Sequence, residues 1–192
     1  MARDHARIRL DIWADEDFTS LSSPAQWLYM RLLTHGDLSY CGVTDWRPGR
    51  LAASSSDLSP EDVEHFAGEL EAGRFLVIDR STEEALVRSY VKHDGLMDKW
   101  NLAAAVARTF TTVASKPIRG VISHELHRLQ EDEPEYRGWA REDVRKMLRR
   151  QQIDPVDALD MTPANPSDRP NDCPSKRGND CPNDCPNERG AA

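Results

Sequence analysis

The sequence predicts a mainly helical α+β fold, in which a small domain of helices and a β-hairpin precedes a helical extension and a polar tail. Residues 23–36 and 59–73 carry apolar side chains at helical spacing between capping signals. Two apolar runs, 75–79 and 85–91, flank a polar turn, which is the pattern of a β-hairpin. With 192 residues and 39% hydrophobic content, the chain is long enough to bury one modest core. The predicted boundaries are 7–92 for the domain, 93–153 for the extension and 154–192 for the tail.

The first predicted elements are a short strand and an amphipathic helix. Residues 7–13 alternate apolar and polar side chains, which indicates a strand. In the helix, Ser23 suits the N-cap, Pro24 the first helical position and Gly36 the position beyond the end. The apolar stripe of this helix consists of Ala25, Leu28, Tyr29, Leu32 and Leu33.

Two further helices and the hairpin complete the predicted domain. A strand at "GVTDW" precedes a short helix that Pro48 opens. Ser59 and Asp62 stand at capping-box spacing at the start of the next helix, which Gly73 ends. The order helix, strand, helix, helix, strand, turn, strand predicts a winged helix-turn-helix, and the alternative is a generic small α+β domain. The predicted core is Leu28, Leu32, Val63, Phe66, Leu70, Leu76, Ile78, Leu86 and Val87.

Residues 99–152 carry helical patterns throughout. Three helices are expected at "NLAAAVARTF", at "PIRGVISHELHRLQ" and at the short basic stretch "REDVRKMLRRQQ". The middle helix places one apolar face at Ile118, Val121, Ile122, Leu126 and Leu129. From Pro155 onward the chain is rich in Pro, Asn and Asp and lacks the apolar surface that offsets the entropy of ordering, so we expect disorder there.

The net charge of −8 argues against a protein that binds nucleic acid over its whole surface. Affinity for DNA comes from lysine and arginine side chains that meet phosphates, so binding would rest on local basic groups. These groups are the N-terminal arm, the second predicted helix, the hairpin strands and the helix at 141–150. The candidate DNA-binding residues are Arg7, Arg9, Arg47, Arg50, Arg74, Arg80, Arg88, Arg141, Arg145, Lys146, Arg149 and Arg150. For each group the alternative is a solvated surface without a partner.

The third predicted helix is acidic where a DNA-reading helix would be expected to be basic. Its acidic residues are Glu61, Asp62, Glu64, Glu69 and Glu71, and residues 61–71 contain no Lys or Arg. The helix could still enter a groove through polar contacts from Ser54, Ser55, Ser56 and His65. We favour the other explanation, because carboxylates repel phosphates strongly at close range. In it, arginines elsewhere hold the DNA, and outward-facing Glu61, Glu64 and Glu71 bind a basic protein partner.

No catalytic residue, metal site or cofactor is expected, and the protein is predicted not to be an enzyme. His124 and His127 are three residues apart, whereas zinc-peptidase helices carry histidines four apart. Walker loops, glycine-rich dinucleotide motifs and serine-histidine-aspartate patterns are absent from the sequence. No apolar run matches a membrane span or a signal peptide, so we expect a cytoplasmic protein without a membrane partner.

The tail repeats Asn-Asp-Cys-Pro three times, around Cys173, Cys181 and Cys185. Their spacing differs from the paired cysteines of zinc ribbons, so a zinc site is the less favoured interpretation. A solvated low-complexity tail is the simplest one. A third interpretation is that the repeat matters as DNA, because a gene can contain binding sites for its own product.

Residues 6–94 resemble a family of phage and prophage replication-initiation, or replisome-organiser, proteins. The motifs are Arg7-Ile8, Ile12-Trp13, Asp15-Glu16 and Leu21-Ser22, then the helix with Ala25, Leu28 and Tyr29, and the later hairpin run ending near Lys92-His93. The resemblance implies a winged helix and a place in phage DNA replication inside a bacterial host cell. It supplies no catalytic residue.

The leading hypothesis is therefore a phage-encoded DNA-binding protein that recognises an origin or recruits the replisome. The expected partners are double-stranded DNA, a host or phage replicative helicase or its loader, and further copies of the chain. Two alternatives stay open: a transcriptional regulator, and a protein adaptor that uses the acidic helix to bind a host replication factor.

Overall fold

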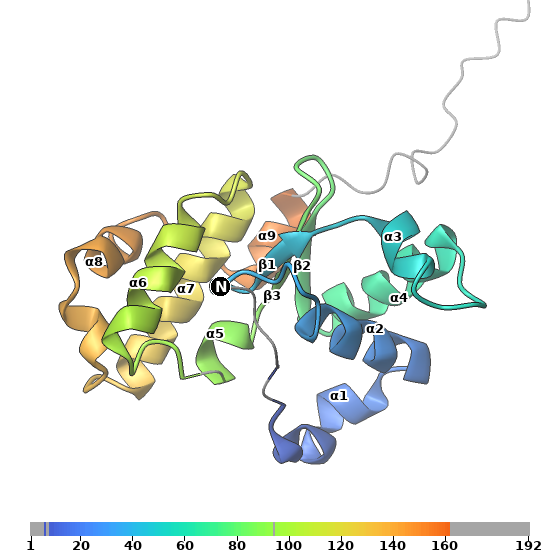
Figure 1. Cartoon of the computed structure of the whole chain (residues 1–192), viewed down its shortest axis with the longest axis horizontal. Coiled ribbons are helices and arrows are strands. Elements are labelled where there is room, and N and C mark those ends of the chain that lie inside the picture. Colours follow the sequence, from blue (N-terminus) through green and yellow to red (C-terminus); the bar gives the residue numbers. More distant parts are fainter. Residues whose placement is uncertain (1–5, 7, 94, 162–192) are drawn as a thin grey trace, which may run out of the picture.

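The computed structural model describes residues 6, 8–93 and 95–161, which form a mainly helical fold around a small antiparallel sheet (Figure 1). The chain begins with η1 (Leu10–Ala14), α1 (Glu16–Ser20) and α2 (Ser23–Leu33). Then follow, in this order, β1 (Val43–Asp45), α3 (Pro48–Ala52), α4 (Pro60–Ala72), β2 (Leu76–Asp79) and β3 (Glu84–Val87). The remaining elements are α5 (Tyr90–His93), α6 (Trp100–Phe110), α7 (Lys116–Asp132), η2 (Arg137–Ala140), α8 (Glu142–Leu148) and α9 (Pro155–Met161).

Local sequence signals set the helix starts. The capping box of α4 is confirmed, since Ser59 Oγ accepts from Asp62 N and Asp62 Oδ2 accepts from Ser59 N. The N-cap of α2 is Ser22, one residue before the predicted one, and its Oγ accepts from Ala25 N at 3.3 Å. Ser115 caps α7 in the same way through Ile118 N.

The sheet has the strand order β1-β3-β2, and both pairings are antiparallel. Val43 pairs with Leu86, and Leu76 pairs with Val87. Helix α4 packs against β2, and α7 and α9 pack against it as well, so that helices flank the sheet on both sides (Figure 1). All four residues of β2 are buried for this reason, and its apolar residues Leu76, Val77 and Ile78 follow one another without alternation before the buried Asp79.

The buried apolar side chains form one cluster that runs from Phe18 to Ala158 and crosses the predicted boundary at 92/93. Eight of the nine predicted core residues are buried. Phe66 is the exception, because it is half-buried and packs against the edge of the cluster. In the described part of the chain, no helix is long and apolar enough to cross a bilayer.

The strand predicted at 7–13 is wrong. Residues Leu10–Ala14 form a 3-10 helix, and the side chain of Leu10 is 89% exposed. Asp15 starts α1 immediately afterwards by accepting from Asp17 N and Phe18 N. A segment with alternating apolar and polar residues forms a strand only where it can pair with the edge of a sheet. Here the helix cap at Asp15 favours helical backbone on either side of it instead.

The second run of the predicted hairpin is shorter than expected, since β3 ends at Val87 and residues 90–93 turn into the helix α5. The predicted start of the tail is also wrong. Residues Pro155–Met161 form α9, with Pro155 and Ala158 buried. Few apolar residues suffice there, because α7 and β2 already present a surface for α9 to cover. Residues 162–192, including the three tail cysteines and their repeat, lie outside the described residues.

A chain that ends at residue 153 is therefore expected to be less stable than a chain that ends at residue 161. Removing α9 exposes the apolar surface of α7 and β2 that it covers. A loss of about 1 kcal/mol lowers the melting midpoint of a protein of this size by roughly 2–4 °C. Equal midpoints in a thermal melt of the two chains would contradict the packing role of α9.

Candidate nucleic-acid interface

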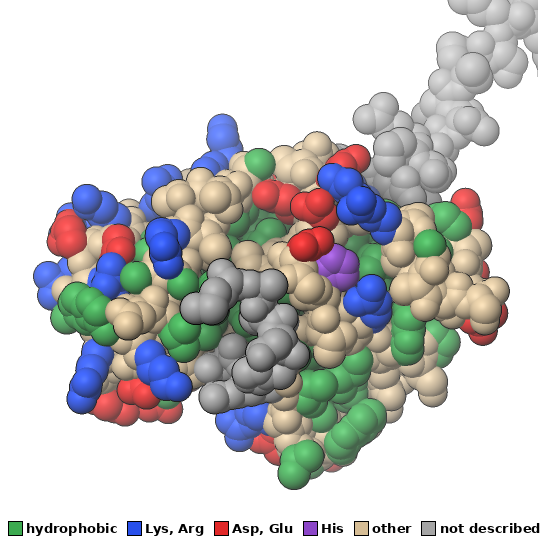
Figure 2. Space-filling model, viewed as in Figure 1, with side chains coloured by type: hydrophobic (Ala, Val, Ile, Leu, Met, Phe, Trp, Pro, Cys, Tyr) green, Lys and Arg blue, Asp and Glu red, His purple; other side chains and the backbone are tan. Residues whose placement is uncertain are grey.

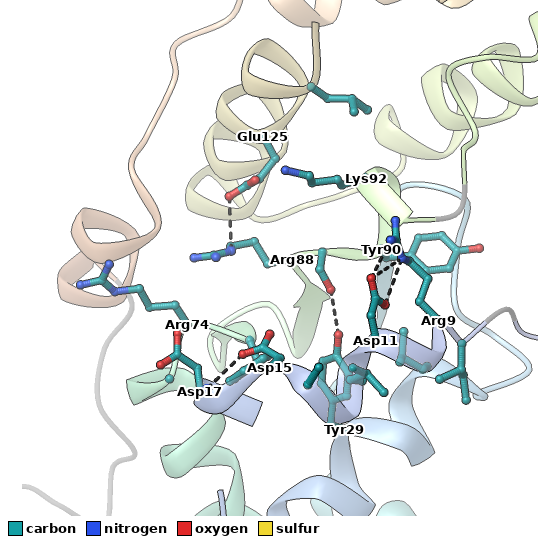
Figure 3. Close-up of a pocket in the computed structure, with 18 of the residues that line it drawn as sticks. Arg9, Asp11, Asp15, Asp17, Tyr29, Arg74, Arg88, Tyr90, Lys92 and Glu125 are labelled. Atoms are coloured by element: carbon teal, nitrogen blue, oxygen red, sulfur yellow. Dashed lines mark hydrogen bonds and ion pairs between the residues drawn. The ribbon is translucent and has the colours of Figure 1, made fainter. Parts of the chain in front are cut away.

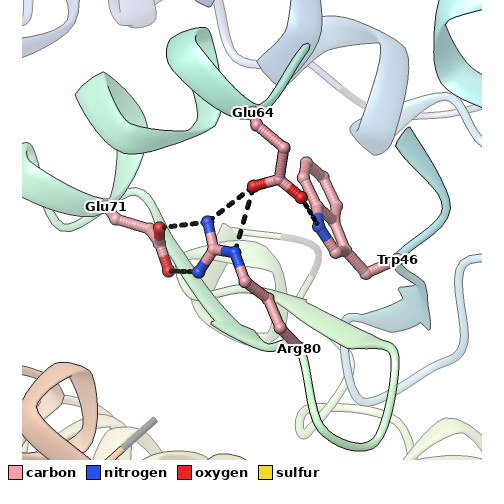
Figure 4. A network of polar contacts seen from close by, with 4 residues as sticks. All are labelled: Trp46, Glu64, Glu71 and Arg80. Carbon is pink, nitrogen blue, oxygen red and sulfur yellow. Dashed lines mark hydrogen bonds and ion pairs between the residues drawn. The ribbon is translucent and has the colours of Figure 1, made fainter. Parts of the chain in front are cut away.

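The acidic residues of α4 mostly have partners within the protein. Arg80, in the turn after β2, donates to Glu64 Oε2 from Nε at 3.0 Å and from Nη2 at 2.9 Å. It also donates to both carboxylate oxygens of Glu71, at 3.3 and 2.9 Å (Figure 4). Trp46 Nε1 donates to the other oxygen of Glu64 at 2.9 Å. Burial alone would lower the pKa of Arg80, but the hydrogen bonds and charges of Glu71 and Glu64 raise it above its ordinary value.

This network corrects two expectations. The side chains of Glu64 and Glu71 are only 21% and 13% exposed, so they do not face outward to meet a partner as predicted. Arg80 is 17% exposed and saturated by two carboxylates, so a phosphate could reach it only after those pairs break. The three residues instead fix the hairpin turn against α4.

Two more acids of α4 also act inside the fold. Glu69 accepts from Ser22 Oγ at 2.9 Å and from Ser22 N at 3.1 Å, which joins α4 to the start of α2. Asp62 completes the capping box, and the hydrogen bonds from Ser59 lower the pKa of its carboxyl. Of the five acids, Glu61 alone is exposed at the surface without one of these roles.

The outward face of α3 and α4 is consequently less acidic than the sequence suggests. On α4 the exposed residues beyond Pro60 are Glu61, His65, Gly68 and Ala72. Next to them, Arg50 of α3 is exposed, and Arg47 pairs with Asp45 at 3.1 Å with both side chains about half exposed. This face is small, polar and close to neutral, so the repulsion expected between α4 and phosphates is largely removed.

Three other predicted arginines, Arg9, Arg74 and Arg88, surround a cavity of about 560 Å³ between the N-terminal segment, the base of the hairpin and α7 (Figure 3). Lys92 and Arg128 line the same cavity and were missed by sequence reasoning, because the chain brings α5 and α7 together only on folding. Arg7 lies outside the described residues.

The charges around this cavity are balanced. Arg9 forms a bidentate pair with Asp11, Arg88 Nε lies 3.3 Å from Glu125 Oε1, and Lys92 pairs with Asp132. Glu125 Oε1 is buried and makes no well-oriented hydrogen bond, so its attraction to Arg88 is that of a charge pair. Cations that are already paired in this way are poorly suited to bind phosphates.

The largest group of basic side chains lies at α8. We call it the α8 surface, and it consists of Arg137, Arg141, Arg145, Lys146, Arg149 and Arg150 together with Arg108 of α6. Helix α6 packs against α8, and basic side chains gather at this end of the molecule with fewer acidic ones among them (Figure 2). Arg141 is held by Asp143, and Arg149 lies 3.9 Å from Glu142. Lys146, Arg145 and Arg150 are exposed, so the surface keeps a net positive charge.

The predicted DNA-binding residues do not form one surface. The helices α3 and α4 lie at one end of the molecule and α8 lies at the other, with the sheet between them (Figure 1). Apart from Arg80, the described arginines among them divide into the α3–α4 face, the cavity and the α8 surface. The first and last carry exposed basic side chains, and at the cavity Arg74 is exposed as well.

Trp100 is a surface residue that the sequence reasoning missed. It is the first residue of α6, one residue before the predicted helix at "NLAAAVARTF", and 48% of it is exposed. The polar pair Asp98-Lys99 before it was the available signal that the helix begins at the surface.

The described ranges contain no cluster of three or more His, Cys, Asp or Glu residues arranged to hold a metal ion. His127 Nδ1 lies 2.8 Å from the carbonyl oxygen of Ser123, so its ring is engaged within α7. Burial raises the pKa of the Cys41 thiol, which disfavours a reactive thiolate.

Comparison of the chain with protein-family models, curated proteins and solved structures gave no match.

Proposed function

We propose that this chain is a non-enzymatic DNA-binding protein whose segment from α2 to β3 is a winged helix-turn-helix. The observation that carries the proposal is the element order α2, β1, α3, α4, β2, β3 combined with the sheet order β1-β3-β2. In such a domain the third helix faces the major groove and the hairpin lies beside it. The pairs formed by Arg80 hold hairpin and helix together and remove most of the negative charge from the helix face.

Two surfaces divide the work in this proposal. The α3–α4 face contacts the duplex through Arg47, Arg50 and His65, and its nearly neutral character suits approach to base edges. The α8 surface supplies phosphate contacts that do not depend on sequence. Arg80 and Arg88 are assigned to the fold, because their guanidinium groups are paired with glutamates.

The proposed setting is phage replication in a bacterial host, as origin recognition or replisome recruitment with a helicase or its loader as partner. It rests on the resemblance of residues 6–94 to replication-initiation proteins. A transcriptional regulator would use the same surfaces, and the two roles differ in target: an origin within or beside this gene, or an operator ahead of other genes.

A protein adaptor is the second candidate function, and the surface that favours it is an exposed apolar segment near the N-terminus instead of helix α4. Four acids of α4 are used internally, which weakens the case for that helix as the partner site. In their place, Ile8, Leu10 and Trp13 form an exposed apolar segment beside the cavity, at 42%, 89% and 60% exposure. Large apolar side chains gathered at a surface mark protein contacts.

Replacement of Arg145, Lys146, Arg149 and Arg150 by alanine is expected to weaken duplex binding by at least about tenfold at low salt. The salt dependence of binding should also become shallower, because each lost phosphate contact removes about 0.9 from the slope of log K against log salt. The measurement is fluorescence anisotropy of a labelled duplex with the full chain.

The matched control replaces Lys92, Lys116, Arg119 and Arg128 by alanine, which removes the same formal charge from residues of α5 and α7. A smaller loss in the control supports local contact. Equal losses in the two variants would show that net charge alone matters and would contradict the α8 surface. The variant Arg50→Ala tests the α3–α4 face separately, and we expect it to lose duplex binding.

A further inference from the structure

Trp100 offers an aromatic face in a basic setting. It is the first residue of α6, 48% of it is exposed, and it borders a depression of about 480 Å³. The same depression is lined by Asp98, Lys99, Asn101, Leu102 and Arg137, so the two cations outnumber the one acid. A partner that covers the exposed part of the indole would gain free energy, because apolar area is removed from water.

The indole is held in a defined position. The guanidinium carbon of Arg141 lies 4.7 Å from the ring centroid, and Arg141 Nη1 donates to the Trp100 carbonyl oxygen at 3.5 Å. Arg141 is itself fixed by two hydrogen bonds to Asp143, at 2.9 and 2.7 Å. A ring that is fixed before binding loses little conformational entropy when a second flat group stacks on it.

Acidic side chains also lie nearby. Asp98 lines the depression itself, and desolvation together with the charges of Glu133, Asp98 and Glu135 raises the pKa of Tyr136, the neighbour of Arg137 in sequence. The α8 surface holds Arg137, Arg141 and Lys146. A polyanion beside Trp100 would therefore be attracted by the α8 surface and repelled by these acids.

We propose that Trp100 stacks against an unpaired base of single-stranded DNA, while Lys99, Arg137 and the α8 surface hold the adjoining phosphates. The inference rests on the proposed DNA-binding function and specifies that the α8 surface binds single-stranded DNA. Bases in a duplex are stacked on one another and do not present their faces, whereas single strands bind to exposed aromatic rings within basic grooves. An opened stretch of DNA is also the product of any initiation event, so the site would hold a strand that the α3–α4 face does not.

The experiment measures anisotropy of three labelled probes with the full chain: a single-stranded oligodeoxythymidine, a duplex, and an RNA oligouridine of the same length. Stacking on one aromatic side chain is worth enough that Trp100→Ala should weaken single-strand binding by about fivefold to a hundredfold. The ratio of single-strand to duplex affinity should fall with it. Trp100→Phe keeps a ring and should recover most of the ratio.

Trp13→Ala is the matched control, because Trp13 is a second exposed tryptophan that belongs to η1 and not to the α8 surface, and it should leave the ratio unchanged. Quenching of the intrinsic tryptophan fluorescence by the single strand should also diminish in Trp100→Phe. Circular dichroism melts confirm that each variant is folded.

An unchanged ratio in Trp100→Ala would overturn the stacking inference and leave the proposed function standing if the duplex still binds. Absence of duplex binding at low salt would instead count against the proposed function itself. Tighter binding of RNA than of DNA, with the same dependence on Trp100, would overturn the assignment to DNA. Failure of both single strands to bind, with capture of a protein by the same surface, would favour the adaptor.

Discussion

Replacement of Phe18 by alanine is expected to lower the free energy of unfolding by about 3–5 kcal/mol, the range for truncation of a fully buried aromatic side chain. Phe18 is 0% exposed, and its ring contacts those of Trp13, Tyr29 and Phe75 with centroids 5.5–5.8 Å apart. It thereby joins the N-terminal segment, α2 and the start of the hairpin. The measurement is chemical denaturation followed by circular dichroism.

Phe66→Ala is the control for Phe18, because it deletes the same atoms at a half-buried position. Its cost should be clearly smaller, since less apolar area leaves water on folding and the surface can close over the gap. Equal costs at Phe18 and Phe66 would mean that the core is not arranged around Phe18.

Replacement of Arg80 by methionine is expected to be strongly destabilising as well. It would leave the carboxylates of Glu64 and Glu71 close together without a counter-charge. Removing one partner of a buried pair costs about 3–5 kcal/mol, and we expect the lower end of that range because water still reaches these side chains. The free energy of unfolding is again the quantity to measure.

Arg47→Met provides the comparison at a surface pair. Arg47 and Asp45 are 47% and 58% exposed, so the change should cost no more than about 1 kcal/mol. Adding Glu64→Gln and Glu71→Gln to Arg80→Met should recover part of the lost stability, because the uncompensated charges are removed. A similar cost for the two arginines, or no recovery, would refute the role given to the network.

The helices could be predicted because their signals are local. Ser59 and Asp62 cap α4 from three residues apart, and the apolar spacing of Ile118 to Leu129 lies within one helix. The strand at 7–13 could not be judged in this way, because whether an alternating segment pairs depends on a sheet edge elsewhere in the chain.

The roles of the acidic residues could not be predicted for the same reason. Glu69 meets Ser22 across 47 residues, and Glu64 meets Arg80 across 16. Helical periodicity predicts that such side chains point to solvent. Only the packed structure shows that Ser22 and Arg80 lie beside them and form hydrogen bonds with them. Glu64, Glu69 and Glu71 of α4 thus hold the hairpin and α2 in place, and the basic side chains to which we assign DNA binding in the proposed function lie on α3 and at α8.

The salt dependence of duplex affinity, measured with the full chain from about 50 mM to about 200 mM salt, tests the central claim most directly. The account predicts that log K falls linearly with log salt, and that the α8 quadruple variant gives a slope shallower by roughly 3 to 4. No detectable duplex binding at the lowest salt, or an affinity that salt does not change, would contradict a protein that holds DNA by its phosphates.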